Sequence, residues 1–115
     1  MGKIYSPPVE AGELPRLDSR KESWQTYVQR EQEYVAKVQK WAKENGSGSL
    51  AGELVTFPYA DGYAQYVVFS LKPVSLIHLP VGDAWQYPYV NRLTAADIKK
   101  EVGRIKGMKK LFASK

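Results

Sequence analysis

The chain has 115 residues, of which 43% are hydrophobic and 25% are charged, a composition typical of one folded domain and unlike that of a disordered chain. It contains no cysteine, which excludes a disulfide framework, a thiolate zinc site and a cysteine nucleophile. The formal net charge is +5, yet residues 92–115 hold eight basic and two acidic side chains, so the remaining residues are close to neutral. This asymmetry predicts an anionic partner for the C-terminal part.

Membrane insertion and secretion are both disfavoured by the hydrophobic pattern. The longest apolar run, residues 66–71 (YVVFSL), is far shorter than the ~20 residues that span a bilayer. The first ten residues, MGKIYSPPVE, lack the apolar centre of a secretory signal. We therefore expect a cytoplasmic protein that does not associate with membranes.

The N-terminal half predicts an arm followed by one long helix. Residues 1–18 are rich in proline and glycine without periodicity, which indicates an extended arm or a mobile terminus. Residues 19–45 read as a helix that begins with a capping box of Ser19 and Glu22 and ends at a left-handed Gly46. Its expected apolar stripe consists of Trp24, Tyr27, Val28, Val35, Val38 and Trp41. A helix of this length also predicts a homo-oligomer.

Residues 46–52 (GSGSLAG) are glycine-rich, but no Gly-Lys-Ser/Thr and no helix follow them, so we interpret them as a flexible connector and not as a phosphate-binding loop. Residues 50–80 then predict three strands in an antiparallel meander, with turns at Asp61-Gly62 and Lys72-Pro73. The long helix would cover one face of this sheet. A small curled barrel is the alternative. The expected fold class is therefore α+β, in one domain spanning residues 1–115.

The last third predicts an aromatic loop at residues 81–93 and a basic helix at residues 94–112. A capping box of Thr94 and Asp97 opens this helix. Gly103 and Gly107 weaken it, so we expect it to fray or stop near Gly107. Six basic residues cover much of its surface and are the candidate nucleic-acid or anion contacts: Lys99, Lys100, Arg104, Lys106, Lys109 and Lys110.

Evidence for catalysis is weak. His78 is the single histidine, and with Asp83 it could act as a general base, but no nucleophile stands at a suitable spacing. One histidine without cysteine does not make a typical zinc site. We therefore predict a non-enzymatic protein with no cofactor and no metal.

Aromatic residues with polar tips gather between residues 59 and 89, where they could stack on a base and donate hydrogen bonds. Two nearby aspartates could accept from a ribose or a base, and an arginine could meet a phosphate. The alternative is that these tyrosines only pack in the core or in an interface. The predicted ligand-binding residues are Tyr59, Asp61, Tyr63, His78, Asp83, Trp85, Tyr87 and Arg92.

Two blocks, Ala60-Asp61-Gly62-Tyr63-Ala64 and Gly82-Asp83-Ala84-Trp85, resemble a group of short uncharacterised proteins of bacteriophages and mobile elements. The resemblance covers roughly residues 50–97 and implies a genomic context but no activity. Because small phage accessory proteins often disable a host defence, we expect a phage-encoded, anti-defence inhibitor in the host cytoplasm. Such a protein would sequester an anionic nucleotide ligand or block a host defence protein. The alternative is a nucleic-acid-binding accessory protein that uses the basic C-terminal helix, with salt-dependent affinity.

Overall fold

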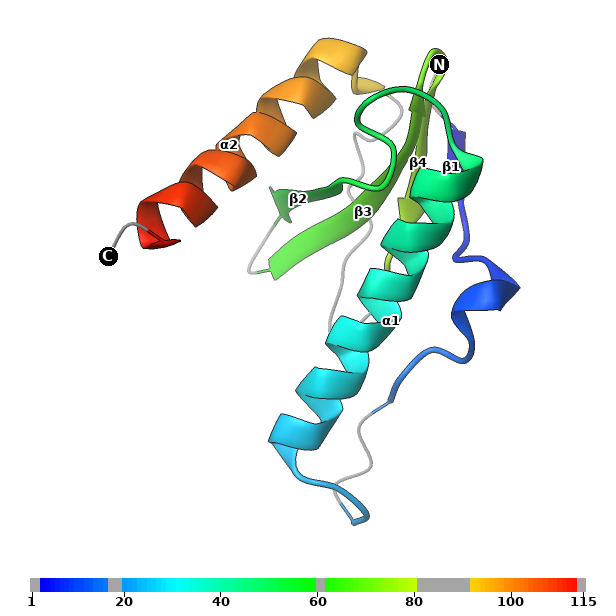
Figure 1. Cartoon of the computed structure of the whole chain (residues 1–115), viewed down its shortest axis with the longest axis vertical. Coiled ribbons are helices and arrows are strands. Elements are labelled where there is room, and N and C mark those ends of the chain that lie inside the picture. The colour runs from blue at the N-terminus through cyan, green and yellow to red at the C-terminus, as the bar shows by residue number, and fades with distance from the viewer. Residues whose placement is uncertain (1–2, 17–19, 60–61, 81–91, 114–115) are drawn as a thin grey trace.

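The computed structural model describes residues 3–16, 20–59, 62–80 and 92–113, without the side chains at 58–59, 62–63 and 108–113. Figure 1 shows a sheet flanked by two helices, which confirms the predicted α+β class. The elements in chain order are β1 (Lys3–Tyr5), the 3₁₀ helix η1 (Val9–Ala11), α1 (Trp24–Asn45), β2 (Leu54–Tyr59), β3 (Gly62–Leu71), β4 (Val74–His78) and α2 (Ala95–Ala113).

The sheet has four strands in the order β1-β4-β3-β2, so the prediction of three antiparallel strands was incomplete. The three predicted strands do form the antiparallel meander, with Val67 of β3 opposite both Leu54 of β2 and Ile77 of β4. The fourth strand, β1, comes from the predicted arm and runs parallel to β4, with Ile4 opposite Leu76. Three residues are too few to show a strand periodicity, which is why the sequence did not reveal β1. Within the described residues the sheet is open, with β1 and β2 at its edges, and it does not form the alternative curled barrel.

The first helix begins later than predicted. α1 starts at Trp24, and the hydroxyl of Ser23 caps it by accepting a hydrogen bond from the backbone N–H three residues later at 3.3 Å. The predicted capping box of Ser19 and Glu22 is therefore wrong as the start of this helix. Ser19 lies outside the described residues, and the Glu22 carboxylate forms an ion pair with Arg30 in the second turn.

The buried face of α1 also differs from the predicted stripe. Trp24 is 62% exposed, although it shares the helical spacing of the core residues. The helix reaches beyond the sheet at its N-terminal end (Figure 1), so a residue there has no sheet to pack against. The side chains that α1 buries are Tyr27, Tyr34, Val38 and Ala42.

The second helix confirms the predicted cap but not the predicted end. The Asp97 carboxylate accepts from the backbone N–H of Thr94 at 2.9 Å, and the Thr94 hydroxyl accepts from the N–H of Asp97 at 3.3 Å. These bonds satisfy amides that the first helical turn leaves without partners. The helix continues to Ala113, so the expectation that it stops near Gly107 was wrong.

Each helix covers one face of the sheet. Tyr34, Val38 and Ala42 of α1 join one buried cluster with Val67, Ile77 and Leu79. Ile98 and Val102 of α2 join the other cluster, with Val55, Phe57, Tyr66, Val68 and Leu76. Neighbouring strand residues alternate between the two clusters, as the pleat of a strand requires. Among the described residues, neither helix has a stretch apolar and long enough to cross a bilayer.

Candidate anion-binding site

Half of the predicted ligand-binding residues cannot be placed, because Asp61, Asp83, Trp85 and Tyr87 lie outside the described residues. Tyr59 pairs with Gly62 and Tyr63 pairs with Pro58 in the backbone register of the β2–β3 hairpin. His78 ends β4 opposite Tyr66, toward the same end of the sheet. Arg92 is exposed and precedes α2. The predicted aromatic site therefore remains a prediction.

His78 is placed as a half-buried strand residue. Its ring centroid lies 5.4 Å from that of Tyr66, on the sheet face that α2 covers. Asp83, the predicted acidic partner of His78, is outside the described residues. In the described part of the chain, no three histidine, aspartate or glutamate side chains are grouped so that they could hold a metal ion.

The glycine-rich segment after α1, residues 46–52, is anchored to the sheet near both of its ends, contrary to the interpretation as a flexible connector. Ser47 donates its backbone N–H to the carbonyl of Phe69 at 2.9 Å, and Gly52 donates to that of Val68 at 2.8 Å. Gly46 has an extended conformation (φ −83°), so the predicted left-handed stop at this residue is wrong. Left-handed φ angles occur instead at Gly48 (91°) and Gly52 (89°).

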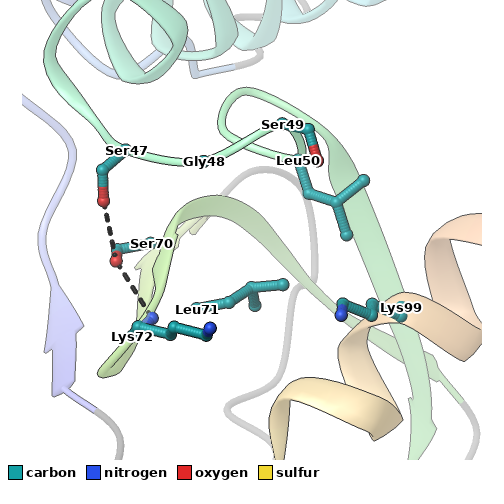
Figure 2. Close-up of a pocket in the computed structure, with 8 residues that line it drawn as sticks. All are labelled: Ser47, Gly48, Ser49, Leu50, Ser70, Leu71, Lys72 and Lys99. Atoms are coloured by element: carbon teal, nitrogen blue, oxygen red, sulfur yellow. Dashed lines mark hydrogen bonds between the residues drawn. The ribbon is translucent and has the colours of Figure 1, made fainter.

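This anchoring holds one side of an open pocket of about 340 Å³. Residues 47–50 form one wall, the end of β3 and the turn after it form a second, and α2 contributes Lys99 (Figure 2). Leu50 and Leu71 supply the apolar part of the lining. We call this the anion pocket, and its lining residues are Ser47, Gly48, Ser49, Leu50, Ser70, Leu71, Lys72 and Lys99.

The charge in the anion pocket is entirely positive. Figure 2 shows Lys72 and Lys99 pointing toward each other from opposite walls, and no lining residue is acidic. Neither lysine forms an ion pair with a described residue. Two ammonium groups that share a pocket repel each other, and a bound anion between them would remove that repulsion. The lining therefore favours an anionic ligand over a neutral or cationic one.

Uncharged donors surround the same pocket. The Ser47 hydroxyl donates to the Ser70 hydroxyl oxygen at 3.0 Å, and the Lys72 backbone N–H donates to that same oxygen at 3.2 Å. Because the Ser70 oxygen accepts both bonds, neither of them uses the hydrogen of its own hydroxyl group. Among the described residues, the amides of Gly48, Ser49 and Leu50 have no backbone acceptor. Successive backbone amides with free hydrogens are a common way to hold phosphate oxygens.

The other basic residues of α2 are not equivalent to Lys99. Arg104 pairs with Glu101 at 2.9 Å, and Lys106 pairs with Glu53 at 3.2 Å. Lys100 is exposed, and the side chains of Lys109 and Lys110 are not described. Of the four predicted anion contacts on α2 whose side chains are described, Lys99 lines the anion pocket and Lys100, Arg104 and Lys106 do not. The glycines and serines of residues 46–52 are a sequence signal for the pocket, but a phosphate-binding loop motif requires a lysine and a helix directly after them. Here both lysines come from distant segments.

Comparisons with known proteins give no independent indication of function. No family model, no curated protein and no solved structure matches this chain.

Proposed function

We propose that this protein is a non-catalytic binding protein whose ligand carries a phosphate or a chemically similar anionic group. The observation that carries the proposal is the convergence of Lys72 and Lys99 on a pocket with no acidic lining residue. The hydroxyl of Ser70 and the amides of residues 48–50, which have no backbone acceptor among the described residues, are candidate donors for the several oxygens of a phosphate. Leu50 and Leu71 supply an apolar surface for the rest of the ligand. A nucleotide combines both features.

The biological setting stays a prediction. The resemblance to phage and mobile-element proteins supports a role as an inhibitor that withdraws a nucleotide signal from a host defence system. Blocking of a host protein, a cytoplasmic location and a homo-oligomeric state are further parts of that prediction.

The test is a thermal-shift panel of nucleotides and cyclic dinucleotides, followed by calorimetric titration of each ligand that stabilises the protein. Lys72→Gln and Lys99→Gln should each weaken binding about tenfold, because each removes one charged contact worth about 1.5 kcal/mol. Lys21→Gln is the matched control, since Lys21 is exposed and precedes α1 at the end of the helix remote from the pocket. Equal affinities for all three variants, or no stabilisation at about 1 mM ligand, would contradict the proposal.

Nucleic-acid binding along α2 is the second candidate, supported by the exposed Lys99 and Lys100 on consecutive positions of a helix rich in basic residues. It predicts an affinity for duplex DNA or RNA that falls steeply with salt. Lys100→Gln separates the two functions. This change should weaken nucleic-acid binding and leave a small ligand in the anion pocket unaffected, because Lys100 does not line that pocket.

A further inference from the structure

A second cleft, which shares no residue with the anion pocket, lies beside β1 on the sheet face that α1 covers. Three aromatic rings from three elements line it: Tyr5 of β1, Trp41 of α1 and Phe69 of β3. Trp41 stacks on Phe69 with ring centroids 5.5 Å apart, and Tyr5 meets Phe69 edge-on at 5.8 Å. The cleft measures about 300 Å³, which is enough for one large apolar side chain. We call it the aromatic cleft.

The aromatic cleft adjoins unused backbone. β1 pairs with β4 on one side only, so its outer edge carries no strand among the described residues. Such an edge presents N–H and C=O groups that can pair with another extended chain. Tyr5 is 43% exposed and Val9 is 89% exposed, so apolar surface continues from the cleft along the same segment. One extended peptide could therefore pair with β1 and place a side chain in the cleft.

Two charged residues of opposite sign near the aromatic cleft, Lys3 and Glu10, define what such a peptide should carry. Glu10 lines the cleft and is exposed. Lys3 lies two residues before Tyr5 on the same strand, so both side chains are on one face of the sheet. A partner strand would thus meet the positive charge of Lys3 on β1 and the negative charge of Glu10 in the lining of the cleft.

We propose that β1 and the aromatic cleft bind an extended segment of a partner protein. The segment carries an acidic, an aromatic or large aliphatic, and a basic residue at alternate positions. The apolar residue fills the cleft, the basic residue meets Glu10, and the acidic residue meets Lys3. Main-chain hydrogen bonds to β1 supply affinity, and the alternate side chains supply specificity.

The probe is the acetylated and amidated peptide Thr-Glu-Thr-Phe-Thr-Lys-Thr, titrated into ¹⁵N-labelled protein. We expect shifts at the amides of residues 3–5 and at the indole N–H of Trp41. Replacing the peptide's phenylalanine with alanine should weaken binding at least about tenfold. The exposed substitution Glu10→Lys should weaken this peptide and strengthen one whose lysine is replaced by glutamate, which separates a charge contact from a loss of folding.

Two N-methylated versions of the peptide test strand addition directly. Alternate residues of a strand point their amides to opposite sides, so methylation at one alternate set should abolish binding and methylation at the other should not. Equal effects of the two sets would overturn the proposal, as would an absence of shifts at about 1 mM peptide. Binding of phenethylamine as tightly as the peptide would also overturn it, by showing that the cleft takes small cations without a backbone.

Discussion

Gly46 lies at the junction of α1, β3 and the anion pocket, and the substitution Gly46→Ala should be strongly destabilising. A Cβ atom there would lie 2.6 Å from the carbonyl oxygen of Ala42 and closer still to the carbonyl oxygen of Phe69. Carbon and oxygen in contact ordinarily stand about 3.3 Å apart, so the end of α1 must move away from β3 by roughly 1 Å. That movement would break the hydrogen bond from the Ser47 amide to Phe69.

The expected cost follows from these contacts. Overpacking against rigid backbone costs about 1–3 kcal/mol, and the lost hydrogen bond costs about 1 kcal/mol. Alanine lowers the conformational entropy of the unfolded chain, which offsets this loss of stability by roughly 0.5 kcal/mol. We therefore expect a loss of about 2–3 kcal/mol, a substantial part of the 5–15 kcal/mol typical of a domain, and a fall in Tm of about 10 °C.

Urea denaturation of four proteins tests this reasoning. Gly48→Ala has open space around its Cβ but a φ of +91°, so it should cost only about 1 kcal/mol. Gly103→Ala also has open space and lies within α2, so it should stabilise by about 0.5–1 kcal/mol. The predicted order of stability is Gly103→Ala, wild type, Gly48→Ala, Gly46→Ala. A Gly46→Ala protein as stable as Gly48→Ala would refute the steric argument.

Three further predictions concern the core and titration. Val38→Ala should cost about 2 kcal/mol in urea denaturation, because Val38 is fully buried, whereas Trp24→Ala should change stability by less than about 0.5 kcal/mol. Hydrogen bonds from the backbone and then the side chain of Thr94 lower the pKa of Asp97 below its ordinary 3.8. The ionised carboxylate therefore stabilises the fold above that pH and the effect disappears in acid, so wild type and Asp97→Asn should differ at pH 7 and converge as the pH falls below 3.8. Burial raises the pKa of Tyr34 above 10.0, so absorbance titration should show that Tyr34→Phe loses a tyrosinate signal that ionises above pH 10.0.

Three of the four strands and the start of the second helix were predictable because their signals are local. Alternating apolar residues and the Lys72-Pro73 turn located three strands, and the spacing of Thr94 and Asp97 located the start of α2. β1 was not predictable, since three residues carry no period and its pairing with β4 joins segments about 70 positions apart. The predicted start of α1 lay too early in the chain because Ser19 and Ser23 both fit the residue preference of an N-cap.

The anion pocket could not be predicted from the sequence, for a different reason. Lys72 and Lys99 are separated along the chain, and only the packing of α2 on the sheet brings them to one cavity with residues 47–50. A glycine-rich segment after a helix looks the same in sequence whether it is loose or hydrogen-bonded to a strand. The distinction here depends on the carbonyls of Val68 and Phe69, which no local pattern in residues 46–52 encodes.

The two edge strands of the sheet differ chemically, and this difference limits where a further strand can pair. β2 forms the border opposite β1 and contains Pro58, whose backbone nitrogen has no hydrogen to donate to an added strand. Pairing with a further strand is therefore disfavoured at β2, whereas β1 contains no proline. The proposed strand addition is therefore confined to the β1 border, so copies of this protein would not extend one continuous sheet through both borders.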